Sequence, residues 1–278
     1  MSERVHDAAE ARKRIATVAH WYHTIDVVPG VSTPGWYDLR HLVDLLPWPD
    51  VRGKRCLDVG TFDGFFAFEL ERRGAAEVVA IDMPDHEQWD WPPDKRPGGP
   101  NAEAVTEFAK LEVGSGFKAL ADLSGSRAEW RALSVYDVSP REMGTFDVVT
   151  CGSLLLHLRD PVRALEALRS VCRGRLLSSE TIAPLLSILG RGRPLFHLSG
   201  TGIACQWWLP NAAGHRRLLW AAGFEVEHAS KPYLVHYNLQ PSPKPSIRTI
   251  RDAFARWLLT GDRSSGMLHQ ALLARPRL

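Results

Sequence analysis

The sequence predicts an α/β protein in which helices flank a mostly parallel sheet. Between residues 51 and 227, short runs rich in apolar and β-branched residues alternate with helical runs, as in successive βαβ units. A glycine-containing turn follows the first of these strands, and acidic residues stand at the ends of later ones. The length of 278 residues fits one large domain with additions.

Seven strands are expected, and each is short, apolar and bounded by turn residues. In chain order they cover residues 55–59, 77–82, 131–135, 146–151, 175–180, 224–227 and 267–274. Helical periodicity predicts helices between them at residues 65–73, 101–112, 162–171 and 211–222. A further helical run covers residues 247–259.

The segments around this core divide the chain into two parts. Residues 1–50 hold a charged helical start and an aromatic stretch, and they are interpreted as an N-terminal cap or lid. Residues 51–278 are interpreted as the main domain, with insertions at 83–100, 183–206 and 230–265. The segment 83–100 is rich in tryptophan and proline, which predicts a loop over the sheet edge or the mouth of an active site, with disorder as the alternative.

Composition argues against several classes of protein. The 34 basic and 32 acidic residues give a net charge of +2, whereas a dedicated nucleic-acid binder is usually strongly basic. No apolar run is long enough to cross a bilayer, and the first residues lack a signal-peptide pattern, so a cytoplasmic protein without a membrane partner is expected. The four cysteines show no CxxC spacing, which predicts neither a disulfide framework nor a metal site.

The turn after the first strand, LDVGTFDGFF, is the sharpest local pattern. Gly60 and Gly64 allow a tight turn that approaches a ligand closely, and the following helix offers free N–H groups. A pyrophosphate site would be expected to show the longer G-x-G-x-x-G pattern. The shorter turn therefore favours an uncharged or carboxylate-bearing ligand over a dinucleotide.

Three acidic residues follow three successive strands. Asp58 ends the first strand, Asp82 ends the second, and Asp137 follows the third. The carboxyl ends of parallel strands meet at one edge of a sheet, where open α/β sheets bind ligands. An acid at the Asp82 position can accept hydrogen bonds from ribose hydroxyls, and Asp137 can accept one from an adenine amino group.

These motifs resemble those of class I S-adenosylmethionine (SAM)-dependent methyltransferases, over residues 54–227. The resemblance implies a Rossmann-like fold and SAM as cofactor, with the loop 58–64 on its methionine part. It also implies that Asp82 holds the ribose, that Met83 packs on the adenine and that Asp137 binds its amino group. Phe62 departs from the family's glycine pattern. The full predicted cofactor set is Asp58, Gly60, Thr61, Phe62, Asp63, Gly64, Asp82, Met83, Tyr136, Asp137, Val138 and Gly152.

A closer likeness covers most of the chain. GWYDLR, CGSLLLHLRDPVRALEAL, GRLLSSETI and WWLPNAAGHRRLLWAAGF resemble the branch of tRNA wobble-uridine methyltransferase-like proteins. GSLLLHL lacks the tyrosine of that branch, and no dedicated basic set for its carboxylated SAM can be matched.

His157 follows the fourth strand and borders the expected crevice. It is the candidate general base, because its ordinary pKa lies near neutrality. Alternatively it fixes the loop or begins the helix entered at Asp160. Structural alternatives exist for two acids as well: Asp58 can brace the loop through backbone N–H groups, and Asp137 can cap a helix.

Six aromatic residues are candidates for a lid or an acceptor pocket. A cationic sulfonium is attracted to aromatic faces, although aromatic side chains also commonly pack in cores. The candidates are Tyr22, His23, Trp36, Tyr37, Trp207 and Trp208.

Three functions are compatible with the sequence. The first is methylation of a small molecule, favoured by the balanced charge and the aromatic candidates. The second is tRNA wobble-uridine modification, and the third is SAM binding without catalysis. The tRNA hypothesis requires a contiguous basic surface, to which the candidate contributors are Arg12, Lys13, Arg14, Arg191, Arg193, Arg216 and Arg217.

Overall fold

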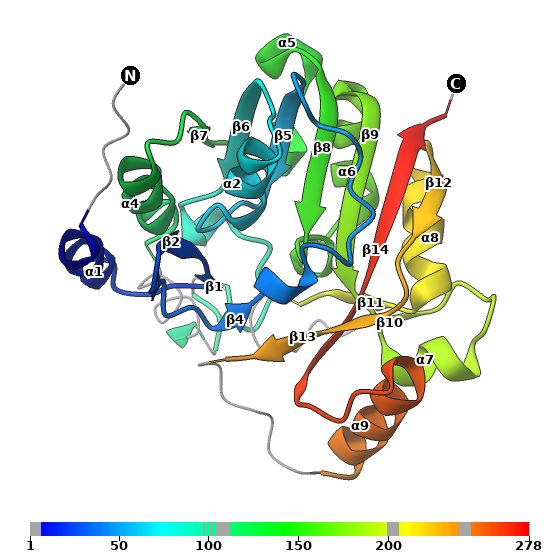
Figure 1. Cartoon of the computed structure of the whole chain (residues 1–278). Helices are drawn as coiled ribbons and strands as arrows, with labels where there is room; N and C mark the ends of the chain where they lie inside the picture. The colour runs from blue at the N-terminus through cyan, green and yellow to red at the C-terminus, as the bar shows by residue number, and fades with distance from the viewer. Residues whose placement is uncertain are drawn as a thin grey trace.

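The protein is a three-layered α/β structure with one long mixed sheet at its centre (Figure 1). The computed structural model describes residues 7–96, 98–100, 102–103, 112–198, 206–238 and 246–277. The helix predicted at 101–112 lies largely outside the described residues, as does Cys205.

Five parallel strands form the core of the sheet, in the order β9-β8-β5-β6-β7. Because β5 lies between β8 and β6, the loops that follow these three strands emerge side by side at the carboxyl edge. The bounds are β5 (Arg55–Val59), β6 (Glu77–Asp82), β7 (Glu129–Ala132), β8 (Phe146–Gly152) and β9 (Cys172–Thr181).

The sheet continues beyond β9 in antiparallel fashion. Strand β14 (Gly266–Pro276) pairs with β9, and its two ends pair with β12 (Phe224–Ala229) and β13 (Tyr233–Tyr237). The N-terminal strands β4 (Tyr37–Asp38) and β1 (His23–Thr24) then extend the sheet from β13. The mostly parallel, Rossmann-like fold is confirmed, and in the described residues β1, β4 and β13 add to the seven expected strands.

Helices cover both faces of the sheet because its strands alternate their apolar side chains between two cores. On one face, Leu57 and Val149 pack with helices α6 and α8. On the other, Cys56 and Val78 pack with α2 and α4. The α-helices are α1 (Ala8–Ala16), α2 (Phe65–Arg72), α4 (Ser115–Ser124), α5 (Pro140–Met143), α6 (Pro161–Val171), α7 (Pro184–Leu189), α8 (Ala212–Ala221) and α9 (Ile247–Thr260).

Short elements complete the described chain. Two hairpins pair β2 (Asp26–Val28) with β3 (Val31–Ser32) and β10 (Phe196–Leu198) with β11 (Trp208–Pro210). The 3-10 turns are η1 (Arg40–Leu42), η2 (His86–Gln88), η3 (Val135–Asp137) and η4 (Leu155–His157).

The third strand was misplaced by the sequence analysis. It was expected at 131–135, but β7 ends at Ala132 and is followed by the turn η3. The Ser134 side chain accepts a hydrogen bond from the Tyr136 N–H and so begins this turn. The helix-cap interpretation of Asp137 was also wrong, since the Ser139 side chain caps α5.

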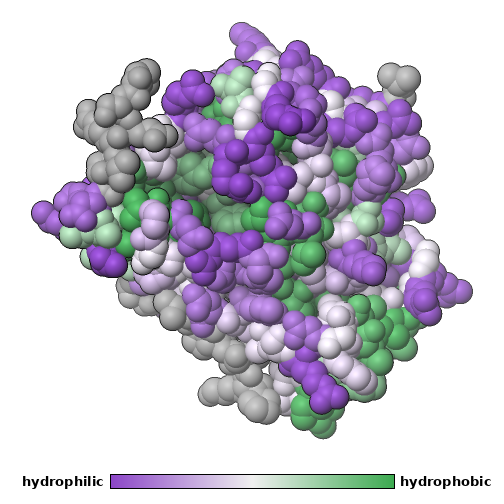
Figure 2. Space-filling view, in the orientation of Figure 1, coloured by the Kyte–Doolittle hydropathy of each residue, from purple (hydrophilic) through white to green (hydrophobic). Residues whose placement is uncertain are grey.

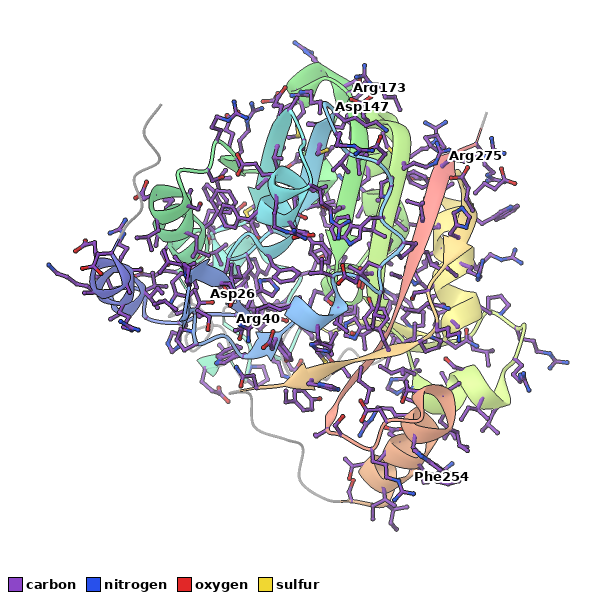
Figure 3. All side chains as sticks on the ribbon, in the orientation of Figure 1. Asp26, Arg40, Asp147, Arg173, Phe254 and Arg275 are labelled. Atoms are coloured by element: carbon purple, nitrogen blue, oxygen red, sulfur yellow. The ribbon has the colours of Figure 1, made fainter. Side chains whose placement is uncertain are left out.

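The N-terminal segment contributes the strands β1 and β4 to the sheet. Arg40 forms ion pairs with Asp26 and with Asp38, which holds β2 and β4 together (Figure 3). The predicted insertion 230–265 likewise contains β13, which links this segment to β14. Both segments therefore lie beside the carboxyl edge of β9.

The surface is polar over most of the face shown in Figure 2, with apolar patches over α7 and α9. Phe254 points outward from α9 (Figure 3). Within the described part of the chain, no helix is long and apolar enough to cross a membrane. Cys56, Cys151 and Cys172 are free thiols buried in the core.

Candidate active site

Backbone hydrogen bonds join the loops at the carboxyl edge of the parallel strands. The Gly60 and Thr61 N–H groups, after β5, donate to the Ile81 carbonyl of β6 at 3.0 and 3.2 Å. The Leu133 N–H, after β7, donates to the Asp82 carbonyl at 3.0 Å. The three loops that the sequence analysis assigned to the cofactor are thus parts of one continuous surface.

The glycine loop requires left-handed backbone at three positions. Gly60, Phe62 and Gly64 have φ angles of 70°, 47° and 92°. A Cβ at Gly64 would lie 2.5 Å from the Phe68 ring and 2.6 Å from the Phe117 ring. Glycine at residue 64 therefore allows both the turn and the close packing of α2 against α4.

Asp82 holds the glycine loop in place. Its Oδ2 accepts a hydrogen bond from the Phe62 N–H at 2.7 Å, and its Oδ1 accepts one from the Met83 N–H at 2.8 Å. Burial, opposed by these bonds, raises the pKa of the carboxyl to about 6. A carboxylate oxygen can accept two hydrogen bonds, so each oxygen keeps capacity for a ligand hydroxyl. The site fits the ribose of SAM on this observation.

Asp58 lies beneath the loop. Its side chain is 2% exposed, and the Thr150 hydroxyl of β8 donates to its Oδ1 at 2.7 Å. Burial raises the pKa of this carboxyl to about 6. This geometry favours the interpretation that Asp58 braces the loop.

Asp63 links the glycine loop to the N-terminal segment. Its Oδ2 accepts the Tyr22 N–H at 2.6 Å and the His23 N–H at 2.9 Å. The carboxyl is buried, which raises its pKa to about 7. Sequence reasoning placed Asp63 at the cofactor but did not foresee this connection.

Aromatic residues of the N-terminal segment gather beside Phe62. The Tyr22 ring centroid lies 4.9 Å from those of Phe62 and Tyr37, and 6.0 Å from that of Trp36. His23 lies 5.7 Å from Phe65, and burial lowers its pKa to about 3, so it is neutral. The structure thus brings these four candidates to the glycine loop.

Trp207 and Trp208 belong to a different cluster, built around Asp90 of the 83–100 segment. The Trp207 indole N–H donates to the Asp90 carbonyl at 2.6 Å, and that of Trp208 donates to the Arg159 carbonyl at 3.1 Å. The Asp90 carboxylate accepts the Tyr136 hydroxyl at 2.6 Å and the Arg159 N–H at 2.7 Å. These bonds hold the segment against the loops after β7 and β8.

The remaining predicted cofactor residues occupy varied environments. Tyr136 has its hydroxyl committed to Asp90, and Val138 packs in the core. Asp137 is exposed at the end of η3, and Met83 directly follows Asp82. Gly152 ends β8, where a Cβ would lie 2.6 Å from the Phe66 ring.

His157 is the last residue of η4, in the loop after β8. It is half-buried, and its N–H donates to the Leu154 carbonyl at 2.9 Å. The cap of α6 is the Asp160 side chain, which accepts the Arg163 N–H at 3.0 Å. His157 therefore does not cap the helix, and its loop lies at the carboxyl edge.

Glu180 positions this loop and was missed by the sequence analysis. Its Oε1 accepts the Leu154 and Leu155 N–H groups at 3.2 Å each. The side chain is 1% exposed, and burial raises its pKa to about 8. The polar run SSET directly after the apolar Leu176 and Leu177 was the signal that could have indicated it.

The basic residues of the tRNA hypothesis separate into two groups. Arg12, Lys13 and Arg14 lie on α1, whereas the arginines of α8 and of the loop after α7 lie across the molecule (Figure 1). Arg14 pairs with Asp122 at 3.0 Å. The described residues therefore do not form the contiguous basic surface that this hypothesis requires.

Comparison with known proteins agrees with this geometry. The family described as "Methyltransferase domain" matches residues 35–229. The ubiquinone biosynthesis O-methyltransferase of Neisseria meningitidis serogroup C is 35% identical over 118 residues, or 42% of this chain and 39% of that protein. A Xanthomonas euvesicatoria protein of the same name is 29% identical over 155 residues, or 55% of this chain and 50% of that protein. The chain thus spans at most about half the length of these curated relatives.

Among solved structures, the N-terminal domain of EvdMO1, crystallised in the presence of S-adenosylhomocysteine and D-fucose, matches over 100% of both chains. Its identity is 16% and its TM-score 0.51. The YcgJ protein of Bacillus subtilis matches 86% of this chain and 98% of its own, with 14% identity and a TM-score of 0.51. At these identities the likeness concerns the fold.

Proposed function

The chain belongs to the methyltransferase-domain family, and we propose that it transfers the methyl group of SAM to a small-molecule acceptor. The observation that carries this proposal is the hydrogen bond from the Phe62 N–H to the Asp82 carboxylate, which connects the glycine loop with the end of β6 at the carboxyl edge of the sheet. This arrangement suits a ligand with a ribose and an amino-acid end. The Asp82 oxygens can accept hydrogen bonds from the ribose hydroxyls, and the adjacent glycine turn lets the backbone come close to the amino-acid end.

Each part of the site has a task in this proposal. Asp82 accepts the ribose hydroxyls, Met83 covers the adenine face and Asp137 accepts the adenine amino group. The glycine loop, braced by Asp58, receives the methionine part. The bound cofactor supplies a sulfonium methyl, which is activated for transfer to a nucleophile. The protein's main contribution is to hold the acceptor in line with that methyl, which can supply up to roughly 7–11 kcal/mol of the barrier reduction in ideal cases.

The acceptor side is proposed to lie beneath the N-terminal segment. Tyr22, Trp36 and Tyr37 form an aromatic wall beside Phe62. Such a wall fits an apolar or aromatic acceptor and disfavours water near the reacting atoms. The matched relatives are named O-methyltransferases, which makes a hydroxyl the first acceptor class to test. His157 is proposed to border this crevice.

A tRNA acceptor is not favoured. The resemblance to the wobble-uridine branch rests on sequence motifs, whereas the relatives matched above are named for ubiquinone biosynthesis. The candidate basic residues lie on opposite sides of the fold (Figure 1). A tRNA would have to contact many phosphates through one basic surface.

Replacement of Asp82 tests the proposal. Asp82→Ala removes both the ribose acceptor and the anchor of Phe62, so SAM affinity should fall by at least about tenfold, the effect of losing one hydrogen bond to a charged group. Calorimetry with SAM, and with NAD as the competing ligand class, measures this directly. Asp85→Ala is the matched control, because Asp85 is exposed and its side chain accepts hydrogen bonds within η2, from the Glu87 N–H and the Gln88 side chain. Equal SAM affinity of wild type and Asp82→Ala, or tighter binding of NAD, would overturn the assignment.

A further inference from the structure

Strand β9 ends in a row of buried polar side chains. Ser178, Ser179, Glu180 and Thr181 are each less than 10% exposed. Ser178 contacts the His215 Nε2 at 2.9 Å, Ser179 contacts the Tyr233 hydroxyl at 2.6 Å and Thr181 contacts the His269 Nε2 at 3.0 Å. A buried polar row in a central strand is uncommon, because each group must find a partner when it loses water.

One of these partners, His269, also binds a residue at the carboxyl edge. Its Nε2 lies 2.9 Å from the Ser153 Oγ, and its Nδ1 lies 3.1 Å from the Met267 carbonyl. A carbonyl only accepts hydrogen bonds, so the Nδ1 carries the proton and the Nε2 presents its lone pair. Because this Nε2 carries no proton, Ser153 can act toward His269 only as a donor, and it shares the lone pair with the Thr181 hydroxyl at 3.0 Å. The lone pairs of the Ser153 Oγ stay available to another group.

Ser153 directly follows β8, at the carboxyl edge of the sheet, with an unusual backbone conformation. Ser153 and Phe62 are the two non-glycine residues with positive φ in the described part of the chain, at 52° and 47°. The Ser153 N–H donates to the Ser179 carbonyl at 2.8 Å. Such left-handed positions cost free energy and often lie at functional sites.

Ser153 precedes a residue that packs on the glycine loop, and it contacts His269, which belongs to an aromatic cluster. The next residue, Leu154, packs on the glycine loop: a Cβ added to Gly60 would lie 3.2 Å from the Leu154 side chain. Tyr233 stacks on His269 with ring centroids 6.1 Å apart, and it shares a cluster with Tyr37. Figure 1 shows β8, β9 and β14, which carry these groups, side by side.

Burial disfavours the charged forms of the titratable side chains around this pair. Burial lowers the pKa of His269 to about 4 and that of His215 to about 3, so both imidazoles are neutral. Burial raises the pKa of Glu180 to about 8 and also raises that of Tyr233, so both are protonated. A neutral hydroxyl can be desolvated here at low cost, whereas an ammonium or carboxylate group would lack a counter-charge.

We propose that the Ser153 hydroxyl binds the hydroxyl group of a neutral alcohol or phenol acceptor, and that His269 is the positioning residue that orients Ser153. This rests on the proposed methyl transfer. The acceptor O–H donates to the Ser153 Oγ, so an oxygen lone pair is directed to the methyl group. The new oxygen–carbon bond forms as the carbon–sulfur bond breaks, its electron pair stays on sulfur, and the hydroxyl proton is released to water.

Loss of the Ser153 hydroxyl should affect the acceptor and not the cofactor. Ser153→Ala should lower kcat/KM for a hydroxyl acceptor about tenfold, the usual effect of one lost hydrogen bond, with the Kd for SAM unchanged. Ser153→Gly also lacks the hydroxyl but tolerates the positive φ, so it separates this loss from backbone strain. Ser178→Ala is the matched control, because it removes a serine–histidine contact of equal length from the α8 side of β9.

His269 is tested by two variants. His269→Ala should lower kcat/KM like Ser153→Ala, whereas His269→Gln places an amide near the Nε2 position and should restore part of the activity. A purely structural role would lower the melting temperature and raise the Kd for SAM together in both variants.

Turnover is measured as S-adenosylhomocysteine formed from SAM with phenol, catechol and benzyl alcohol, and with aniline and benzylamine as amine counterparts. Methylation of a hydroxyl compound that Ser153→Ala and Ser153→Gly impair, but Ser178→Ala does not, supports the proposal. Methylation of the amines only, equal effects of all three variants, or no turnover of any hydroxyl compound by SAM-binding protein overturns it. If calorimetry finds no SAM binding by the wild type, the proposed function itself fails.

Discussion

Buried carboxylates at the carboxyl edge of the sheet each organise a different loop. Asp82 holds the glycine loop, Asp63 holds the N-terminal segment, and Glu180 holds the loop after β8. In each case backbone N–H groups donate hydrogen bonds to the oxygens of the acid. Because burial raises the pKa of all three, their protonation changes within the range of ordinary buffers.

Glu180→Gln is expected to flatten the pH dependence of stability. The pKa of Glu180 is about 8 in the folded protein, whereas an unfolded glutamate has a pKa of about 4.3. The folded state thus binds this proton more tightly, and the free energy of unfolding falls as pH rises between these values, by at most about 1.4 kcal/mol per pH unit. Thermal unfolding of both proteins between about pH 7 and 8 measures the slope, and the difference between the two slopes removes the contribution of unfolded histidines, whose pKa is about 6.5.

The exposed Glu225, which pairs with Arg275, offers a control for this measurement. Glu225→Gln should keep the wild-type slope. Parallel curves for wild type and Glu180→Gln would show that Glu180 does not bind its proton more tightly in the folded state.

His157→Ala should reduce turnover only modestly. His157 ends η4 in a loop that Glu180 already fixes, so its removal should leave the crevice in place. A general base usually contributes about 10²–10⁴-fold to rate. Steady-state kinetics with a turned-over acceptor give the ratio, and a loss above about a thousandfold would assign His157 as the base.

At the scale of elements, the N-terminal segment and the glycine loop form one unit. Strands β1 and β4 extend the sheet from β13, while Asp63 accepts hydrogen bonds from Tyr22 and His23. The N-terminal segment is thus attached at two places, to the sheet through β4 and to the glycine loop through Asp63. The aromatic wall therefore depends on Asp63 for its position.

Asp63→Ala is expected to release residues 22–24 from the glycine loop. The buried His23 N–H and the part-buried Tyr22 N–H would lose their acceptor, at a cost of about 1–3 kcal/mol for the buried group. Hydrogen exchange at residues 22–24 should accelerate, and SAM affinity should fall. Asp122→Ala, which breaks only the exposed pair with Arg14, is the control and should change both little. Unchanged exchange in Asp63→Ala would contradict the role of this carboxylate.

At the scale of the whole molecule, the order of the strands creates the site. Placing β5 between β8 and β6 brings together loops that are up to about a hundred residues apart in the chain, which is the usual result of this doubly wound topology. The antiparallel strands β12, β13 and β14 add a second wall beside β9. The same topology keeps the basic groups of α1 and α8 apart, on opposite sides of the sheet (Figure 1).

The protein should therefore bind tRNA weakly. With the basic groups separated, few phosphates can be neutralised at once, and affinity should not exceed the non-specific range of about 10⁻⁴–10⁻⁶ M at physiological salt. Fluorescence anisotropy with unmodified tRNA at two salt concentrations tests this. Tighter binding that falls steeply with salt would reopen the nucleic-acid hypothesis.

Local sequence patterns predicted an element well where the apolar spacing and the flanking turn residues indicated the same bounds. The glycine loop, the strands β5 and β6 and the helices α2 and α6 occur close to the predicted residues. The prediction was wrong at β7, where Ser134 starts a turn earlier than strand propensity suggested. Helix α4 was missed although Phe117, Leu120 and Leu123 recur at helical spacing. Strand β13 was assigned to an insertion, and its pairing with β4 and β14 joins segments far apart in the chain.

The sequence by itself determined the fold class and the place of the cofactor loop, since both depend on contacts between near neighbours in the chain. Only the tertiary structure decided which residues meet across that loop: Asp63 with Tyr22, Glu180 with Leu154, and Ser153 with His269. Those pairs are 26 to 116 residues apart. Their partners are selected by strand order and by the need of buried polar groups for hydrogen bonds, and neither leaves a local periodic signal.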